Sequence, residues 1–196
     1  MNEGERVDER RSLIVDDGPV RVAAERAAGL LGWPGVVLPE VTVFGCRFLP
    51  VVALEVPVHE ARQRDGDGPQ LDGDVLSMWE WPESPGPAPV VRLSGGLFRV
   101  RHRFPATVSQ AREWRPFGPA AVLASPVAVV EEVNRWECAL HGVGLVSAEP
   151  ISADRAEVEH VPAEAGRRGR ARRRTADRWI EETLYALALD AGVLAP

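Results

Sequence analysis

Apolar positions in the first third of the chain follow helical spacing and then strand spacing. Over residues 19–31 they recur every three or four positions, and Gly32 followed by Pro34 ends this predicted helix. Two β-rich runs follow, 36–44 and 48–58, and the short link between them predicts an antiparallel hairpin. The second run is almost continuously apolar, which is typical of a strand covered on both faces.

The middle of the chain is more polar and is interrupted by glycine and proline. Residues 59–75 predict a surface loop, 76–81 a strand and 83–89 a proline-rich loop. Residues 90–104 predict a second hairpin, with Ser94-Gly95-Gly96 as its turn. The second arm of this hairpin alternates apolar residues with arginines and therefore presents one cationic face.

The last part of the chain alternates helices with short strands. A helix over 105–115 is followed by a buried strand at 120–124, and Ser125 then Pro126 begin a helix that Gly142 ends. The predicted buried face of this helix consists of Val129, Val130, Val133, Trp136 and Leu140. A strand at 144–148 completes a strand–helix–strand unit, which favours a parallel crossover, and 149–161 predicts an edge strand.

These elements predict an α/β fold with a mixed β-sheet flanked by helices. The pattern divides the chain into a polar N-terminal arm (1–18), an α/β core domain (19–161), an arginine-rich linker (162–175) and a C-terminal amphipathic helix (176–192).

Composition narrows the classes of protein. The chain is 45% apolar and 27% charged, which is enough to bury a core and excludes a disordered or collagen-like protein. No apolar run is long enough for a transmembrane helix, and the charged N-terminus lacks the apolar segment of a secretory signal. Two widely spaced cysteines, Cys46 and Cys138, fit a reducing compartment. We therefore expect a cytoplasmic protein that does not contact a membrane.

The net charge of −6 is not typical of a general nucleic-acid-binding protein, so any contact with phosphates must be local. Two arginine clusters are candidates for such a contact. One consists of Arg99, Arg101 and Arg103, and the other of Arg167, Arg168, Arg170, Arg172, Arg173 and Arg174. Each is interpreted either as a nucleic-acid-binding surface or as solvated surface charge.

Several tryptophans admit two interpretations. Trp79 and Trp81 fall on one face of the predicted strand at 76–81, and Trp179 lies at the start of the last helix. Tryptophan side chains are either core anchors or hot spots of protein interfaces. The sequence leaves open whether these three residues form an interface with a partner protein or a second copy of the chain.

Common metal-binding and nucleotide-binding motifs are absent from the sequence. Asp65-Gly66-Asp67-Gly68 resembles the start of a calcium loop, but Pro69 and Leu76 occupy two ligand positions and exclude an EF-hand. The four histidines lack zinc-ligand spacing, and no phosphate-binding glycine loop is present.

Glu40 and Glu55 are the most informative acidic residues, because each lies in an otherwise apolar β-rich run. A buried, unpaired carboxylate costs several kcal/mol, so each needs a cation, solvent at a strand end, or a metal ion. One interpretation exposes Glu40 and pairs Glu55 with Arg47 or Arg62. The other brings both carboxylates to the end of the hairpin, where a divalent cation would offset their repulsion.

The order of elements and two short motifs resemble the restriction-endonuclease-like fold of the PD-(D/E)xK nuclease superfamily. Leu38-Pro39-Glu40-Val41 is similar to the Pro-Asp strand of that family, and Glu55-Val56-Pro57 to its (D/E)-x-K motif. The resemblance extends from the following helix and strand (109–126) to Gly142-Val143-Gly144-Leu145-Val146, and spans roughly 19–148 with an insertion near 59–96.

In that family two carboxylates hold Mg²⁺ and the lysine assists the attacking water. The resemblance assigns the metal positions to Glu40 and Glu55, with Glu25 as an additional acid. Pro57 replaces the lysine, and the chain contains no lysine to take over its role. We therefore expect a non-catalytic accessory or regulatory protein without a cofactor, which contacts nucleic acid or a partner protein. The alternatives are a Mg²⁺-dependent endonuclease using Glu40 and Glu55, and an assembly subunit without nucleic-acid contact.

Overall fold

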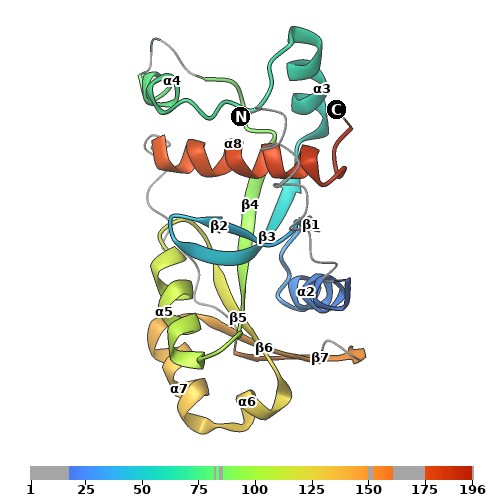
Figure 1. The fold of residues 1–196 in the computed structure, drawn as a ribbon, viewed down its shortest axis with the longest axis vertical. Coiled ribbons are helices and arrows are strands. Elements are labelled where there is room, and N and C mark those ends of the chain that lie inside the picture. Colours follow the sequence, from blue (N-terminus) through green and yellow to red (C-terminus); the bar gives the residue numbers. More distant parts are fainter. Residues whose placement is uncertain (1–17, 82, 84–85, 150–151, 161–174, 196) are drawn as a thin grey trace, which may run out of the picture.

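A computed structural model of the chain describes residues 18–81, 83, 86–149, 152–160 and 175–195. Its elements in chain order are α2 (Gly18–Leu30), β1 (Val36–Val37), β2 (Val41–Val43), β3 (Cys46–Leu54), α3 (Val56–Asp65), α4 (Gly73–Met78), β4 (Val91–Arg99), α5 (Phe104–Trp114), β5 (Ala120–Ala124), α6 (Pro126–Val130), α7 (Glu132–His141), β6 (Gly144–Glu149), β7 (Ser152–His160) and α8 (Thr175–Asp190). The predicted α/β class, a mixed open sheet flanked by helices, is confirmed (Figure 1).

The described strands form one seven-stranded sheet in the order β1-β3-β4-β5-β6-β7, with β2 paired to β3 beside this path. Strands β1 and β2 are antiparallel to β3, as the first predicted hairpin requires. Strands β4, β5 and β6 are parallel neighbours, and β7 returns antiparallel at the edge. The predicted parallel unit of strand, helix and strand at 120–148 is therefore confirmed.

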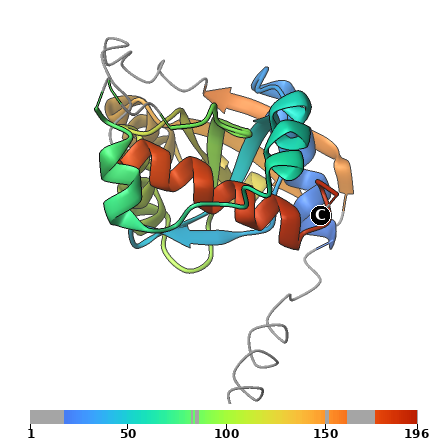
Figure 2. The ribbon, with the colours of Figure 1, turned by 90° about the horizontal axis from the view of Figure 1, so that it is seen from above.

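Helices cover both faces of the sheet. Helix α2 packs on one face through small residues such as Ala24 and Ala27, which are fully buried. On the opposite face, α5 and α8 cover an aromatic cluster in which the Phe48 ring lies 4.1 Å from Trp114 and 5.5 Å from Phe98, between ring centroids. Helix α8 runs past α4 at one of its ends and α3 at the other (Figures 1 and 2). None of the described helices is long and apolar enough to cross a membrane.

The predicted strand 48–58 is too long, and the loop that follows it is largely helical. Strand β3 ends at Leu54 and α3 begins at Val56, because Pro57 lies in the first helical turn, where its missing N–H breaks no hydrogen bond. The predicted strand 76–81 is also wrong. The Asp72 side chain accepts hydrogen bonds from two backbone N–H groups and begins α4 instead.

The predicted hairpin at 90–104 is wrong, because β4 is a single strand paired with β3 and β5. A Cβ atom at Gly95 would lie 2.4 Å from the Trp33 ring, and one at Gly96 would lie 3.1 Å from Nε1 of Trp114. The two glycines therefore accommodate aromatic rings against the middle of a strand, and they do not form a turn.

The predicted single helix over 126–142 is broken at Glu131, whose ψ of 113° is that of an extended residue. The break changes which side of the following helix faces the sheet. Of the predicted buried face, Val129 is buried, whereas Val130, Val133, Trp136 and Leu140 are exposed. This part of the prediction is wrong, and α7 instead buries Asn134 and Cys138.

Candidate functional site

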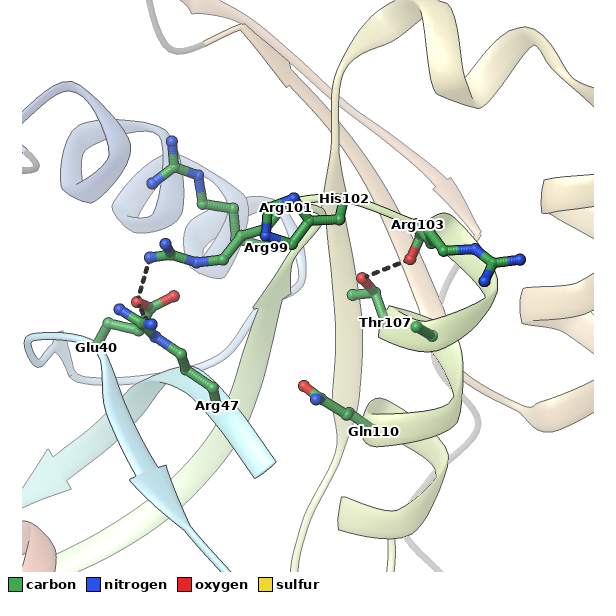
Figure 3. Close-up of a pocket in the computed structure, with 9 residues that line it drawn as sticks. Glu40, Arg47, Arg99, Arg101, His102, Arg103, Thr107 and Gln110 are labelled. Carbon is green, nitrogen blue, oxygen red and sulfur yellow. Dashed lines mark hydrogen bonds and ion pairs between the residues drawn. The ribbon is translucent and has the colours of Figure 1, made fainter. Parts of the chain in front are cut away.

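A pocket of about 150 Å³ lies where β4 ends and α5 begins (Figure 3). Its lining is mostly cationic and consists of Glu40, Arg47, Arg99, Arg101, His102, Arg103, Ala106, Thr107 and Gln110. The lining therefore contains four arginines and one glutamate. It carries more charged side chains than the lining of a second pocket beside α2, where Arg99 is the one charged residue among those described.

Glu40 links two of these arginines. Its Oε2 atom accepts a hydrogen bond from Nε of Arg47 at 2.6 Å and another from Nη2 of Arg101 at 2.5 Å. The Glu40 side chain is 11% exposed, so these charge-assisted bonds compensate for its burial. The carboxylate is thus held as a counter-ion between the β2–β3 hairpin and the segment that leads into α5.

The arginines around the pocket do not converge on one point. Arg47 and Arg101 reach toward Glu40, whereas Arg103 points away from it at the start of α5 (Figure 3). Arg99 also lines a second pocket, beside α2 and the end of β5. The positive charge is therefore spread from the hairpin, across the carboxyl ends of two parallel strands, to the first turn of α5, which is a common location of ligand sites in α/β proteins.

Helix α5 adds a favourable field for anions. Its N-cap residue Arg103 makes no side-chain capping bond, and Pro105 lies in its first turn. Thr107 donates from Oγ1 to the Arg103 carbonyl at 3.3 Å, while Ala106 and Thr107 line the pocket. The positive end of the helix dipole therefore lies at the same place as the arginines.

The three predicted arginines of the first cluster lie at one pocket, but not in the predicted way. Strand β4 ends at Arg99, Arg101 lies in a bend, and Arg103 precedes α5, so they do not share one strand face. Sequence reasoning missed Arg47 as a member of this site. Arg47 lies opposite Thr42 in the β2–β3 pairing, and strand pairing alone brings it to this pocket. The second predicted cluster, at 167–174, lies outside the described residues.

The structure does not bring the three predicted acids together. Glu55 lies between the end of β3 and α3, whereas Glu40 lies beside the start of β3. At about 3.3 Å per extended residue, these two points along β3 are roughly 20 Å apart. Its Oε1 atom lies 3.1 Å from Nε of Arg92, and not beside Arg47 or Arg62 as one interpretation had it. Glu25 pairs with Arg21 on α2. The described residues contain no group of three or more acidic, histidine or cysteine side chains that would hold a metal ion.

The three predicted interface tryptophans have different environments. The Trp179 ring stacks on Phe44 at 5.1 Å, and the Trp79 ring lies 5.7 Å from the guanidinium carbon of Arg178. Trp81 is 64% exposed. Trp79 and Trp179 thus have contacts within the molecule, while Trp81 projects into solvent.

Two buried thiols have raised pKa values, and one of them adjoins the pocket. Cys46 precedes Arg47, and its Sγ donates to the carbonyl of the lining residue Gln110 at 3.7 Å. Burial raises the pKa of the Cys138 thiol to about 12, with a smaller contribution from Glu137, and burial also raises the pKa of Cys46. Both cysteines are free and buried, so they are neutral packing residues at physiological pH. The cations that line the pocket are mainly arginines, which stay protonated at physiological pH.

No family model, curated protein or solved structure matches this chain. Any statement about what the pocket binds accordingly depends on its own geometry and charge.

Proposed function

We propose that this chain is a non-catalytic binding protein that contacts the phosphates of a nucleic acid through the arginine pocket. The observation that carries the proposal is the pocket itself, whose lining combines four arginines and the start of α5 with a single glutamate. Guanidinium groups bind phosphate oxygens with two parallel hydrogen bonds and remain charged at all physiological pH values.

The spread of the arginines favours a polyanion over a single small anion. Arg47 and Arg101 lie on one side of the pocket and Arg103 points away from them, so one phosphate would not reach all of them (Figure 3). A chain of phosphates would contact them in succession. This local cationic surface also reconciles nucleic-acid binding with the net charge of −6.

The arrangement of the acids favours binding without cleavage. In the restriction-endonuclease-like resemblance, Glu40 and Glu55 would share a Mg²⁺ ion. Each is instead paired with an arginine, and the two lie near opposite ends of β3. The position of the family's lysine is Pro57, which lies in the first turn of α3. We infer a degenerate member of that fold whose carboxylates no longer form a metal site.

Binding of fluorescein-labelled DNA and RNA oligonucleotides, followed by fluorescence anisotropy over a range of NaCl concentrations, tests this proposal. Log affinity decreases linearly with log salt, and the steepness of this decrease is expected to be smaller by about one for each phosphate-binding arginine removed. Arg101→Ala and Arg103→Ala are the two variants that test this. Arg112→Ala is the matched control, because Arg112 is exposed on α5 but does not line the pocket.

Two further results would contradict the proposal in different ways. Binding that is lost on deletion of 167–174 but unchanged in both pocket variants would assign the contact to that segment. Nicking of plasmid DNA with Mg²⁺ or Mn²⁺, abolished by Glu55→Ala, would show that the protein is an endonuclease.

A further inference from the structure

A second surface of the molecule carries an unusual number of exposed apolar side chains. Along α6 and α7 five large residues are between 61% and 80% exposed, namely Val127, Val130, Val133, Trp136 and Leu140. Single exposed apolar residues are common, but five large ones on two successive short helices are typical of an interaction surface. This row, called the α6–α7 surface below, lies on different helices from the arginine pocket.

The break between the two helices sets which side of α7 is buried. Glu131 is extended, and the side-chain amide of Asn134 then donates to the Ala128 carbonyl at 2.7 Å and to Oε2 of Glu131 at 3.2 Å. These hydrogen bonds hold α7 so that Asn134 and Cys138 face the sheet. The apolar side of α7 thereby faces solvent. Exposing apolar surface to water costs free energy, which contacts with a partner would offset.

The charges beside the apolar row indicate the chemistry of its partner. At 3.6 residues per turn, Val133, Trp136 and Leu140 fall within one arc of α7, with Glu132 on one side of that arc and Glu137 on the other. Arg135 lies beyond Glu132, and its Nε atom donates to the Val129 carbonyl. The apolar row is therefore bordered by carboxylates on both sides.

We infer that the α6–α7 surface binds an amphipathic helix of a partner protein whose apolar stripe is flanked by basic residues. The apolar stripe would cover Val133, Trp136 and Leu140, and the basic residues would pair with Glu132 and Glu137. A second copy of this chain is a poorer occupant. In a two-helix contact between copies, the Glu137 border of one α7 would face either the same border or the Glu132 border of the other, which places carboxylates against carboxylates.

Synthetic helical peptides of about 18 residues provide the probe, since shorter isolated helices are marginal in water. One peptide has a leucine stripe flanked by arginine, and the other has the same stripe flanked by glutamate. The arginine-flanked peptide is expected to bind the full chain, and the glutamate-flanked peptide to bind at least about tenfold more weakly. Trp136→Ala is expected to weaken binding about 30-fold, and the reversal Glu132→Arg with Glu137→Arg about fivefold.

Trp81→Ala is the matched control, because Trp81 is 64% exposed and Trp136 is 65% exposed, but on different parts of the molecule. Equal binding of both peptides, equal loss in the two tryptophan variants, or no binding of the arginine-flanked peptide would each overturn the inference. Self-association in sedimentation velocity that Trp136→Ala abolishes would also overturn it, in favour of a second copy. None of these outcomes depends on nucleic-acid binding, so they test this surface separately from the arginine pocket.

Discussion

At the residue scale, Arg62 and Glu182 form a buried ion pair that no sequence pattern indicates. Nη1 and Nη2 of Arg62 donate to the two carboxylate oxygens of Glu182 at 2.7 and 3.0 Å, and both side chains are almost completely buried. Glu182 also accepts from the backbone N–H of Gln70 at 2.8 Å. The pair thus joins α3, the following loop and α8.

Tyr185 and His59 extend this network. The Tyr185 hydroxyl lies 3.0 Å from Nδ1 of His59, whose Nε2 lies 2.8 Å from the Ala195 carbonyl. Burial raises the pKa of Tyr185, the Arg62 charge acts in the opposite direction, and Glu182 adds to the rise. These groups are more than 100 residues apart in sequence, so only the fold reveals that they are partners.

Removing one member of the Arg62–Glu182 pair is expected to lower the stability of the fold. Glu182→Ala leaves the Arg62 charge buried without its partner and should lower the free energy of unfolding by about 3–5 kcal/mol. Glu25→Ala, which breaks the exposed pair with Arg21, should change it by less than about 1 kcal/mol. Urea unfolding followed by circular dichroism measures both. Similar values for the two variants would contradict the assigned role of burial.

At the element scale, apolar periodicity predicted the elements whose boundaries are set by local sequence signals. Helices α2 and α5 and strand β5 appear at the predicted positions, because their spacing and their Gly or Pro boundaries are local signals. The errors arose where one residue type has two roles. Gly95 and Gly96 indicated a turn, whereas in β4 they make room for Trp33 and Trp114, which come from distant segments.

The same limit applies to the candidate site. The arginines at 99, 101 and 103 were predicted because they lie close together in sequence, whereas Arg47 reaches their pocket only through the pairing of β2 with β3 and of β3 with β4. The interpretation that brings Glu40 and Glu55 together differs from the structure for a related reason. The sequence does not show that the run ends at Leu54 and that Pro57 turns the chain into a helix.

Gly95→Ala tests the role of the glycine pair in β4. The added Cβ would lie 2.4 Å from the Trp33 ring, so this variant should be destabilised by about 1–3 kcal/mol. Gly29→Ala is the control on α2, where nothing lies within 4 Å of the added atom. It should be stabilised by about 0.5–1 kcal/mol, because alanine favours the helix. Thermal unfolding of the two variants should shift in opposite directions, and a neutral Gly95→Ala would argue against the close packing of Trp33.

At the scale of the whole molecule, α8 belongs to the main core although an arginine-rich segment precedes it in sequence. Four α8 residues are buried in the same cluster as Phe48 of β3 and Trp114 of α5, namely Ile180, Leu184, Tyr185 and Ala188. The predicted polar arm at 1–18 and the linker at 162–175 lie outside the described residues except for Gly18 and Thr175. Within the described residues, α8 is therefore a structural layer of the α/β unit and not an appendage.

One leucine on α8 and one on α7 separate this core role from the role inferred for α7. Leu184 of α8 is fully buried, so Leu184→Ala removes packed methyl groups and should lower the free energy of unfolding by about 2–5 kcal/mol. Leu140 of α7 is 61% exposed, so Leu140→Ala should change stability by no more than about 0.5 kcal/mol. Urea unfolding is expected to remain a single transition in both variants, because α8 shares the core of the sheet. A separate early transition in Leu184→Ala would instead mean that α8 unfolds independently. A large loss of stability in Leu140→Ala would mean that α7 needs its apolar side for folding, which would leave less reason to assign that side to a partner.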